Sequence, residues 1–204
     1  MSSAPPSIPT IFPPPSGDGG SLSRLTVAEY HQLGEDGVLA DDVELLEGHV
    51  VKKMPKNPRH VVVTKRLRRL MEAMLKGRWE VASQDPVTIS ASEPEPAVVL
   101  VRGTEEDYAQ KHPVPADVGL IVEVSDSTLH RDRGVKKRIY AKASIPVYWI
   151  VNLVNNQIEV YTQPSGPTEP PDFAGREIIG AASNIPVILE GTVVGILAVQ
   201  DILG

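Results

Sequence analysis

Residues 118–136 read VGLIVEVSDSTLHRDRGVK, and two patterns meet in this segment. The first part, Val118–Val124, is apolar and rich in β-branched residues apart from one glutamate, and it is too short for a typical helix. Such a run predicts a central strand that is covered on both faces. After Ser127 the sequence becomes basic and helical until Pro146 ends the helix. A buried strand followed by a helix predicts an α/β or α+β fold.

Glu123 is the charged residue inside this strand. A carboxylate within a central strand is costly unless it lies at the strand end, is paired, or binds a metal ion. Two interpretations of Glu123 follow. Either its side chain faces an edge of the sheet or forms a salt bridge, or it is a metal ligand at the carboxyl end of the strand. Lys136 follows one turn into the helix. It is either a solvated lysine or a residue whose ammonium group folds back over the strand end.

The flanking sequence adds further elements around this core. Residues 26–29 have the pattern of a helical capping box, and residues 43–54 predict a β-hairpin with a glycine in its turn. An amphipathic helix is predicted from residue 58 to residue 76. We expect one central mixed β-sheet flanked by helices, with further strands at residues 79–83, 87–90, 97–101, 147–151, 157–161, 177–179, 187–189 and 192–199.

Length and composition limit the class of protein. The chain has 204 residues, enough for one domain with a sizeable core. Residues 1–21 contain six Pro, five Ser and three Gly and predict a disordered or draped tail, so residues 22–204 are expected to form a single domain. The absence of cysteine excludes a disulfide framework, a cysteine zinc site and a cysteine nucleophile. No apolar run approaches the roughly 20 residues that span a bilayer, and no export signal is recognisable, so we expect a cytoplasmic protein without membrane contact.

The basic residues are concentrated in two segments although the net charge is −6. Residues 52–78 hold ten Lys and Arg against one acid, and residues 130–142 hold six against one acid. If the two segments meet in space, they form a positive face that attracts polyanions. Otherwise each is the solvated side of an amphipathic helix. We expect DNA as the partner, with contacts from Lys65, Arg66, Arg69, Arg131, Arg133 and Lys137.

Further carboxylates stand near these elements. Glu93 and Glu95 lie in an EPEP sequence before an apolar strand and share a face by the period-two rule, as a solvated edge or as part of a site. Glu44 lies within the first hairpin, either as an outward residue or as a functional one. Carboxylates on neighbouring strands with a lysine close by suit Mg²⁺ or Mn²⁺. Such an ion activates water and neutralises charge during phosphodiester cleavage, while the lysine positions or deprotonates the attacking water.

Six blocks of the sequence, taken in order, resemble the Uma-two family, a group of restriction endonucleases in the PD-(D/E)XK nuclease-like superfamily. The resemblance implies a restriction-endonuclease-like core, DNA cleavage that depends on a divalent metal, and a possible homodimer. The matching blocks extend from Leu25 to Tyr161 and are Leu25–Tyr30, Val43–Gly48, Glu93–Pro96, Ile121–Ser125, Asp132–Lys136 with Tyr140, and Ile145–Val151.

The resemblance also implies roles for individual residues. Glu123 matches the acidic metal ligand, and the backbone carbonyl of Val124 would be a further ligand. The lysine that normally stands two residues later is Ser125 here, and Lys136 takes its place from the next helix. Glu44 matches an early glutamate of the family. These assignments predict Glu44, Glu123 and Lys136 as catalytic residues.

One position departs from the family pattern. The pattern Glu-Pro-x-Pro-Asp places a metal-binding aspartate where this chain has Ala97. Glu95 lies two residues earlier, its Cα displaced by roughly 6.5 Å along the strand, and would compensate only in part. The predicted metal ligands are therefore Glu123, Val124 and Glu95, with Mg²⁺ or Mn²⁺ bound weakly. We expect a DNA endonuclease that is weakened or inactive; the alternative is a catalytically inactive nucleic-acid-binding or interaction module on the same fold.

A metal-independent hydrolase is disfavoured. The sequence has no Gly-x-Ser-x-Gly elbow, no His-Glu-x-x-His motif and no Walker loop. His60 and His130 begin the two basic helices and are expected to be ordinary surface residues or phosphate contacts. No histidines are paired at ligand spacing, because the five are scattered along the chain as His31, His49, His60, His112 and His130.

Overall fold

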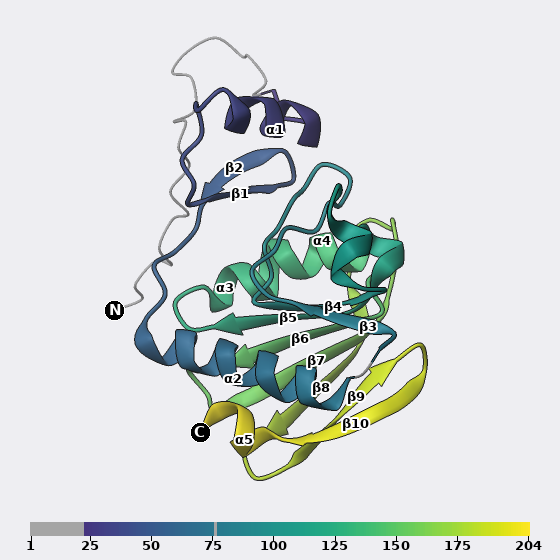
Figure 1. The fold of residues 1–204 in the computed structure, drawn as a ribbon. Helices are drawn as coiled ribbons and strands as arrows, with labels where there is room; N and C mark the ends of the chain where they lie inside the picture. The colour runs from purple at the N-terminus through teal and green to yellow at the C-terminus, as the bar shows by residue number, and fades with distance from the viewer. Residues whose placement is uncertain (1–22, 76) are drawn as a thin grey trace, which may run out of the picture.

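The computed structural model describes residues 23–75 and 77–204, and its centre is a six-stranded mixed sheet (Figure 1). The predicted tail of residues 1–21 lies outside the described residues. Strands β5 and β6 run parallel and every other neighbouring pair is antiparallel. The mixed sheet flanked by helices is therefore confirmed. In spatial order the strands are β3 (Trp79–Ala82), β4 (Val98–Arg102), β5 (Val118–Ser125), β6 (Val147–Asn152), β7 (Gln157–Pro164) and β8 (Phe173–Gly180).

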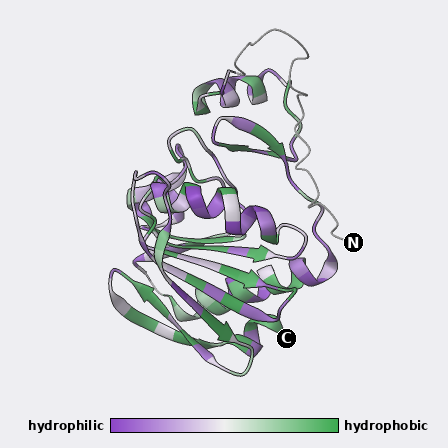
Figure 2. Ribbon diagram, turned by 180° about the vertical axis from the view of Figure 1, so that it is seen from behind, coloured by the Kyte–Doolittle hydropathy of each residue, from purple (hydrophilic) through white to green (hydrophobic). Residues whose placement is uncertain are grey.

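Helices cover both faces of this sheet because its central strands are apolar on both sides. Helix α2 (Pro58–Met74) buries Val63, Leu67 and Met71 against one face. Helix α4 (Lys137–Lys142), which follows the three-residue helix α3 (Leu129–Arg131), buries Ile139 and Tyr140 against the other face. Figure 2 shows the same division, with largely hydrophobic strands in the sheet and helices that alternate between hydrophobic and hydrophilic residues.

The two basic segments consequently do not form one continuous positive face. Each helix buries its apolar stripe on its own side of the sheet, so the basic sides of α2 and α4 point away from each other. The segments meet only at their beginnings, beside the carboxyl end of β5, where Lys56 and Arg131 line one cleft. Of the two alternatives, the solvated sides of two amphipathic helices therefore describe most of each segment, and the segments meet only locally at the two helix starts.

A small layer from the N-terminal part of the chain packs beside the sheet (Figure 1). It contains helix α1 (Val27–Glu35) and the hairpin of β1 (Val43–Leu46) and β2 (His49–Lys52), which share an apolar cluster. The predicted capping box is present: the Thr26 hydroxyl accepts from the Glu29 amide at 3.2 Å, and the Glu29 carboxylate accepts from the Thr26 amide at 2.8 Å. A β-bridge between Leu45 and Glu93 connects the hairpin to the segment before β4.

One expectation about strands was wrong, and one strand has a different end. Residues 87–90 form a turn with an isolated bridge rather than a strand, because the facing segment contains Pro94 and Pro96, which have no amide hydrogen to donate. The predicted strand at 192–199 ends one residue early, since Val199 begins helix α5 (Val199–Leu203). The hairpin of β9 (Asn184–Leu189) and β10 (Thr192–Ala198) packs with α5 in the α2 core.

The remaining connection contains two short 3-10 turns, η1 (Glu105–Tyr108) and η2 (Pro115–Asp117), which lie between β4 and β5. Across the described residues, we find no helix with both the length and the apolar character that a membrane crossing requires.

Candidate functional site

A polar cleft with a volume of about 80 Å³ lies at the carboxyl end of β5. Side chains from the β1–β2 hairpin, the start of α2, the segment before β4 and the end of β5 form its walls. The lining residues include Glu44, Lys53, Lys56, Asn57, His60, Glu95, Ala97, Glu123, Arg131, Asp132 and Lys136. The cleft therefore collects most of the carboxylates singled out in the sequence together with several basic side chains.

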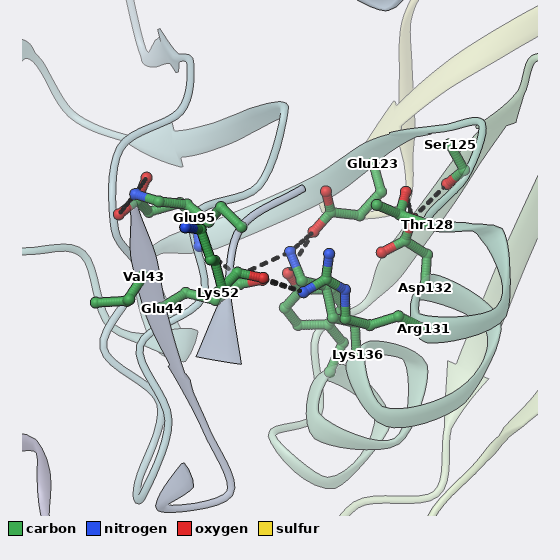
Figure 3. Close-up of polar contacts among 12 residues, drawn as sticks. Val43, Glu44, Lys52, Glu95, Glu123, Ser125, Thr128, Arg131, Asp132 and Lys136 are labelled. Carbon is green, nitrogen blue, oxygen red and sulfur yellow. Dashed lines mark hydrogen bonds and ion pairs between the residues drawn. The ribbon is translucent and has the colours of Figure 1, made fainter. Parts of the chain in front are cut away.

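Three of the predicted residues form one contiguous ion-paired group (Figure 3). The Nζ atom of Lys136 lies 3.0 Å from Oε1 of Glu123 and 3.0 Å from Oε2 of Glu44. Nη1 of Arg131 lies 3.4 Å from Oε1 of Glu44. All four side chains are buried, so these charges interact with little screening by solvent.

The backbone that carries Lys136 is a π-helical turn, η3 (Asp132–Lys136). The turn is tied to the end of β5 because Oδ2 of Asp132 accepts hydrogen bonds from the hydroxyls of Ser125 and Thr128, both at 2.7 Å. The hydroxyl of Tyr148 also donates to the Asp132 carbonyl at 3.0 Å. Single π-helical turns occur frequently at functional sites. Here the turn directs the lysine side chain back toward the strand.

Glu123 faces the side of the sheet that α4 covers, where Ile121 also lies, because side chains alternate along β5. Its Oε1 atom accepts from Lys136 and from the Tyr140 hydroxyl at 2.8 Å. Among the described residues nothing donates to its Oε2 atom, and the residue lines the cleft. Burial raises the pKa of Glu123 to about 7, although Lys136 opposes the shift. The carboxylate is thus fixed through one oxygen and offers the other to the cleft.

Lys136 is a cation in this environment. Burial alone would favour its neutral form, but Glu123, Glu44 and Asp132 outweigh that cost and raise its pKa above the ordinary range of lysine. The hydroxyl of Tyr140 keeps its proton too, because burial and the nearby Glu123 raise its pKa well above the ordinary value. Of the two roles considered for this lysine, the structure favours a charge that stabilises and positions over a group that removes a proton.

Ala97 and Glu95 decide how well a metal ion can be held. The Ala97 methyl group lines the cleft and supplies no oxygen. Glu95, the expected partial substitute, is engaged by Lys53, whose Nζ lies 2.8 and 2.9 Å from its two carboxylate oxygens. Both oxygens of Glu44 face cations as well. Neither Glu95 nor Glu44 therefore offers an unpaired carboxylate in place of the aspartate of the family pattern.

The chemistry of the remaining donors fits a divalent cation with a reduced ligand set. Oε2 of Glu123 and the backbone carbonyl of Val124 are the oxygens that would hold it, since both residues line the cleft. Mg²⁺ commonly binds through one or two carboxylates and keeps several water molecules. A single carboxylate satisfies the lower limit of that requirement, so the binding of Mg²⁺ or Mn²⁺ would be weak.

The six basic residues expected to contact DNA have different surroundings. Lys65 and Arg69 are exposed on α2 and have no acidic partner among the described residues. Arg66 donates to the Ile202 carbonyl at 3.2 Å. Arg131 is buried in the cleft wall beside Glu44, so it is not on the open surface where it was expected. The last two are in ion pairs, Arg133 with Glu159 and Lys137 with Asp172.

The sequence predicts His60 to be an ordinary surface residue or a phosphate contact. In the structure it lines the cleft, and its Nδ1 atom is buried without a hydrogen-bond partner among the described residues. Burial and the neighbouring Lys56 lower its pKa, so the ring is neutral. A signal was present in the sequence, because His60 lies three residues after the helix cap Asn57, whose side chain accepts from the His60 amide at 2.9 Å.

The arrangement defines a class of protein. The mixed sheet with helices on both faces matches the fold of a solved structure. That structure, described as a putative nuclease belonging to DUF820 from Anabaena variabilis, superimposes with a TM-score of 0.69 at 12% sequence identity, covering 88% of this chain and 97% of that chain. This likeness establishes the shared fold.

The chain belongs to the Uma2 (Uma-two) family. Residues 27–185 match the family model, whose description is "Putative restriction endonuclease". The match confirms the resemblance seen in the six sequence blocks and supports a nuclease-like function. None of the curated proteins matches the chain.

Proposed function

We propose that this protein is an endonuclease of the PD-(D/E)XK type that acts on DNA, and that its metal-dependent cleavage is strongly weakened by Ala97. The observation that carries the proposal is the buried Glu44–Lys136–Glu123 group at the end of β5, which shares one cleft with Ala97. Binding of phosphate alone would not require a strand glutamate held in this way. The family description and the shared nuclease fold support the same class of reaction.

Glu123 and Val124 would hold Mg²⁺ or Mn²⁺ together with water. When bound, such an ion activates water as a nucleophile and neutralises charge that develops on the phosphate. The protein's own contribution is orientation: Lys136 and Tyr140 both donate to Oε1 of Glu123, which keeps Oε2 directed at the cleft. Glu44 holds Lys136 from the opposite side at 3.0 Å.

Lys136 would stabilise the transition state as a fixed positive charge. Its ammonium group is already positioned and buried, so it pays little reorganisation cost when negative charge builds up on a phosphate oxygen. Lys53 and Lys56 line the same cleft and would attract the DNA backbone toward it. Contacts of this kind determine affinity and salt dependence and carry no base information.

A second candidate is a catalytically inactive nucleic-acid-binding module. The observation that favours it is the pairing of Glu44 and Glu95 with cations. Of the predicted metal ligands, only Glu123 then keeps a carboxylate oxygen, Oε2, without a donor among the described residues. In this alternative the basic residues at the helix starts bind the phosphate backbone, and no cleavage follows.

Incubation with supercoiled plasmid in Mg²⁺, Mn²⁺ or EDTA separates the two. The native chain should nick slowly with metal, Glu123→Ala should abolish nicking, and Ala97→Asp should increase the rate at least tenfold. Ala97→Asn is the matched control, since it adds the same volume without the charge. Nicking that survives EDTA or Glu123→Ala would overturn the proposed site. No cleavage by the native chain and by Ala97→Asp, with DNA binding retained, would establish the binding module instead.

A further inference from the structure

A second group of ligand-type side chains lies outside the cleft, beside α1. It consists of His31 from α1, Glu93 from the segment before β4, and His112 from the connection before η2. One ligand atom from each of the three lies within 4.8 Å of the others. No histidine pair was apparent from spacing in the sequence, because the fold brings together residues that are far apart in the chain.

Glu93 is the unusual member of this group. Its side chain is only 4% exposed, yet no Lys or Arg among the described residues pairs with it. Its Oε1 atom lies 2.6 Å from Nε2 of His31, and its Oε2 atom accepts from the Thr88 hydroxyl at 2.7 Å. A buried carboxylate requires a cation or strong hydrogen bonds. Glu95, two residues along, has Lys53 for this purpose, whereas Glu93 has only a histidine ring.

We propose that His31, Glu93 and His112 bind one zinc ion. Two imidazole nitrogens and one carboxylate oxygen form a ligand set typical of Zn²⁺, whereas Mg²⁺ prefers oxygen ligands alone. The Thr88 hydroxyl orients Glu93 from behind, as second partners of metal ligands usually do. The bound cation also supplies the charge that the buried Glu93 lacks.

The geometry requires a small adjustment of two exposed rings. Tetrahedral zinc ligands at ~2.1 Å from the ion lie roughly 3.4 Å apart, compared with separations of up to 4.8 Å in this group. His31 and His112 are exposed and line a surface hollow, so their rings can rotate without disturbing the core. Three protein ligands leave the fourth position for water or an external ligand.

Binding would link the N-terminal layer to the loop before β5. The ion would join α1 to the segment before β4 and to the connection that follows β4, and it would replace the hydrogen bond between His31 and Glu93. This site is independent of the nuclease proposal, because none of its three ligands lines the cleft at the end of β5.

Calorimetric titration of the full chain with Zn²⁺, and separately with Mg²⁺, tests the proposal. The native chain should bind one Zn²⁺ with micromolar or tighter affinity that Mg²⁺ does not reduce. His31→Gln, His112→Gln and Glu93→Gln should each weaken binding at least tenfold, whereas His130→Gln, which changes an exposed histidine elsewhere, should not.

Cobalt provides an independent readout, because Co²⁺ in a tetrahedral nitrogen–oxygen site absorbs visible light. The absorption should appear with the native chain and disappear with His112→Gln, an exposed position whose change leaves the core intact. Absence of Zn²⁺ binding by the native chain would overturn the proposal. Binding that is unchanged in both His31→Gln and His112→Gln would overturn it equally.

Discussion

The ammonium group of Lys136 lies 3.0 Å from the carboxylate of Glu123, although the two residues are separated by a strand end, a short helix and a π-helical turn. The strand position that the family resemblance associates with a lysine is occupied by Ser125. Its hydroxyl donates to Asp132 at 2.7 Å and so anchors the turn that carries Lys136. Ser125 therefore supports the turn from which Lys136 reaches Glu123.

Substitution Lys136→Met should destabilise the fold by about 3–5 kcal/mol, because it leaves the charges of Glu44 and Glu123 buried without their shared partner. Urea unfolding of Lys136→Met, of Glu123→Gln and of the double variant would measure the coupling free energy between Lys136 and Glu123. The double variant should be more stable than the sum of the single changes predicts. Strict additivity would show that the ion pair contributes nothing.

The raised pKa of Glu123 makes stability depend on pH. The folded state holds the proton up to about pH 7 and the unfolded chain releases it near 4.5. In that interval the folded state binds more protons, so stability falls as pH rises, by up to ~3 kcal/mol. Glu123→Gln should remove this slope, as thermal melts between pH 4.5 and 7.5 would reveal. The exposed Glu177→Gln is the control and should leave the slope in place.

Glu159 should act in the opposite direction at low pH. Burial favours its protonated form, but hydrogen bonds from Arg133, Asn152 and Tyr161 outweigh that cost and lower its pKa to about 2. Stability from this carboxylate is present above about pH 4.5 and is lost as pH falls toward 2. Glu159→Gln should lower the free energy of unfolding by ~2 kcal/mol at pH 7. This figure is smaller than the pKa shift alone would give, because solvent screens the partly exposed arginines that pair with Glu159. The difference in the free energy of unfolding between Glu159→Gln and the native chain should be smaller in unfolding curves at pH 3.

DNA binding should weaken with salt through the exposed face of α2. Each phosphate contact contributes about 0.9 to the slope of log affinity against log salt concentration. If Lys65 and Arg69 each contact one phosphate, the double variant Lys65→Ala/Arg69→Ala should therefore reduce the slope by about 1.8. The loss should be similar for unrelated sequences, because phosphate contacts carry no base information. Fluorescence anisotropy at several salt concentrations measures the slope. A control variant, Lys111→Ala, lies in an exposed loop and should leave it unchanged.

Much of the fold followed from local patterns. The apolar run of residues 118–124 became β5, the helical spacing after Pro58 became α2, and the capping box at Thr26 begins α1. These predictions succeeded because strand burial, helix periodicity and capping depend on residues close together in the chain. The prediction for segment 87–90 failed because the segment that faces it, a few residues further along, contains Pro94 and Pro96, which have no amide hydrogen to donate.

The site was predictable only in part. Glu44, Glu123 and Lys136 were recognised as candidates from their unusual settings and from the family blocks, and the structure brings them together. The pairing of Glu95 with Lys53 could not be foreseen, because it depends on how the first hairpin docks beside β4. The separation of the two basic segments was equally hidden, since it depends on which face of the sheet each helix covers.

That placement of α2 and α4 on opposite faces limits how a duplex can reach Glu123. The cleft lies at the end of β5 between two helix starts, and Lys56 and Arg131 line it from either side. Under the proposed endonuclease function, each copy of the chain has one such cleft and would act on one strand at a time. A double-strand break would then require a second copy on the opposite strand.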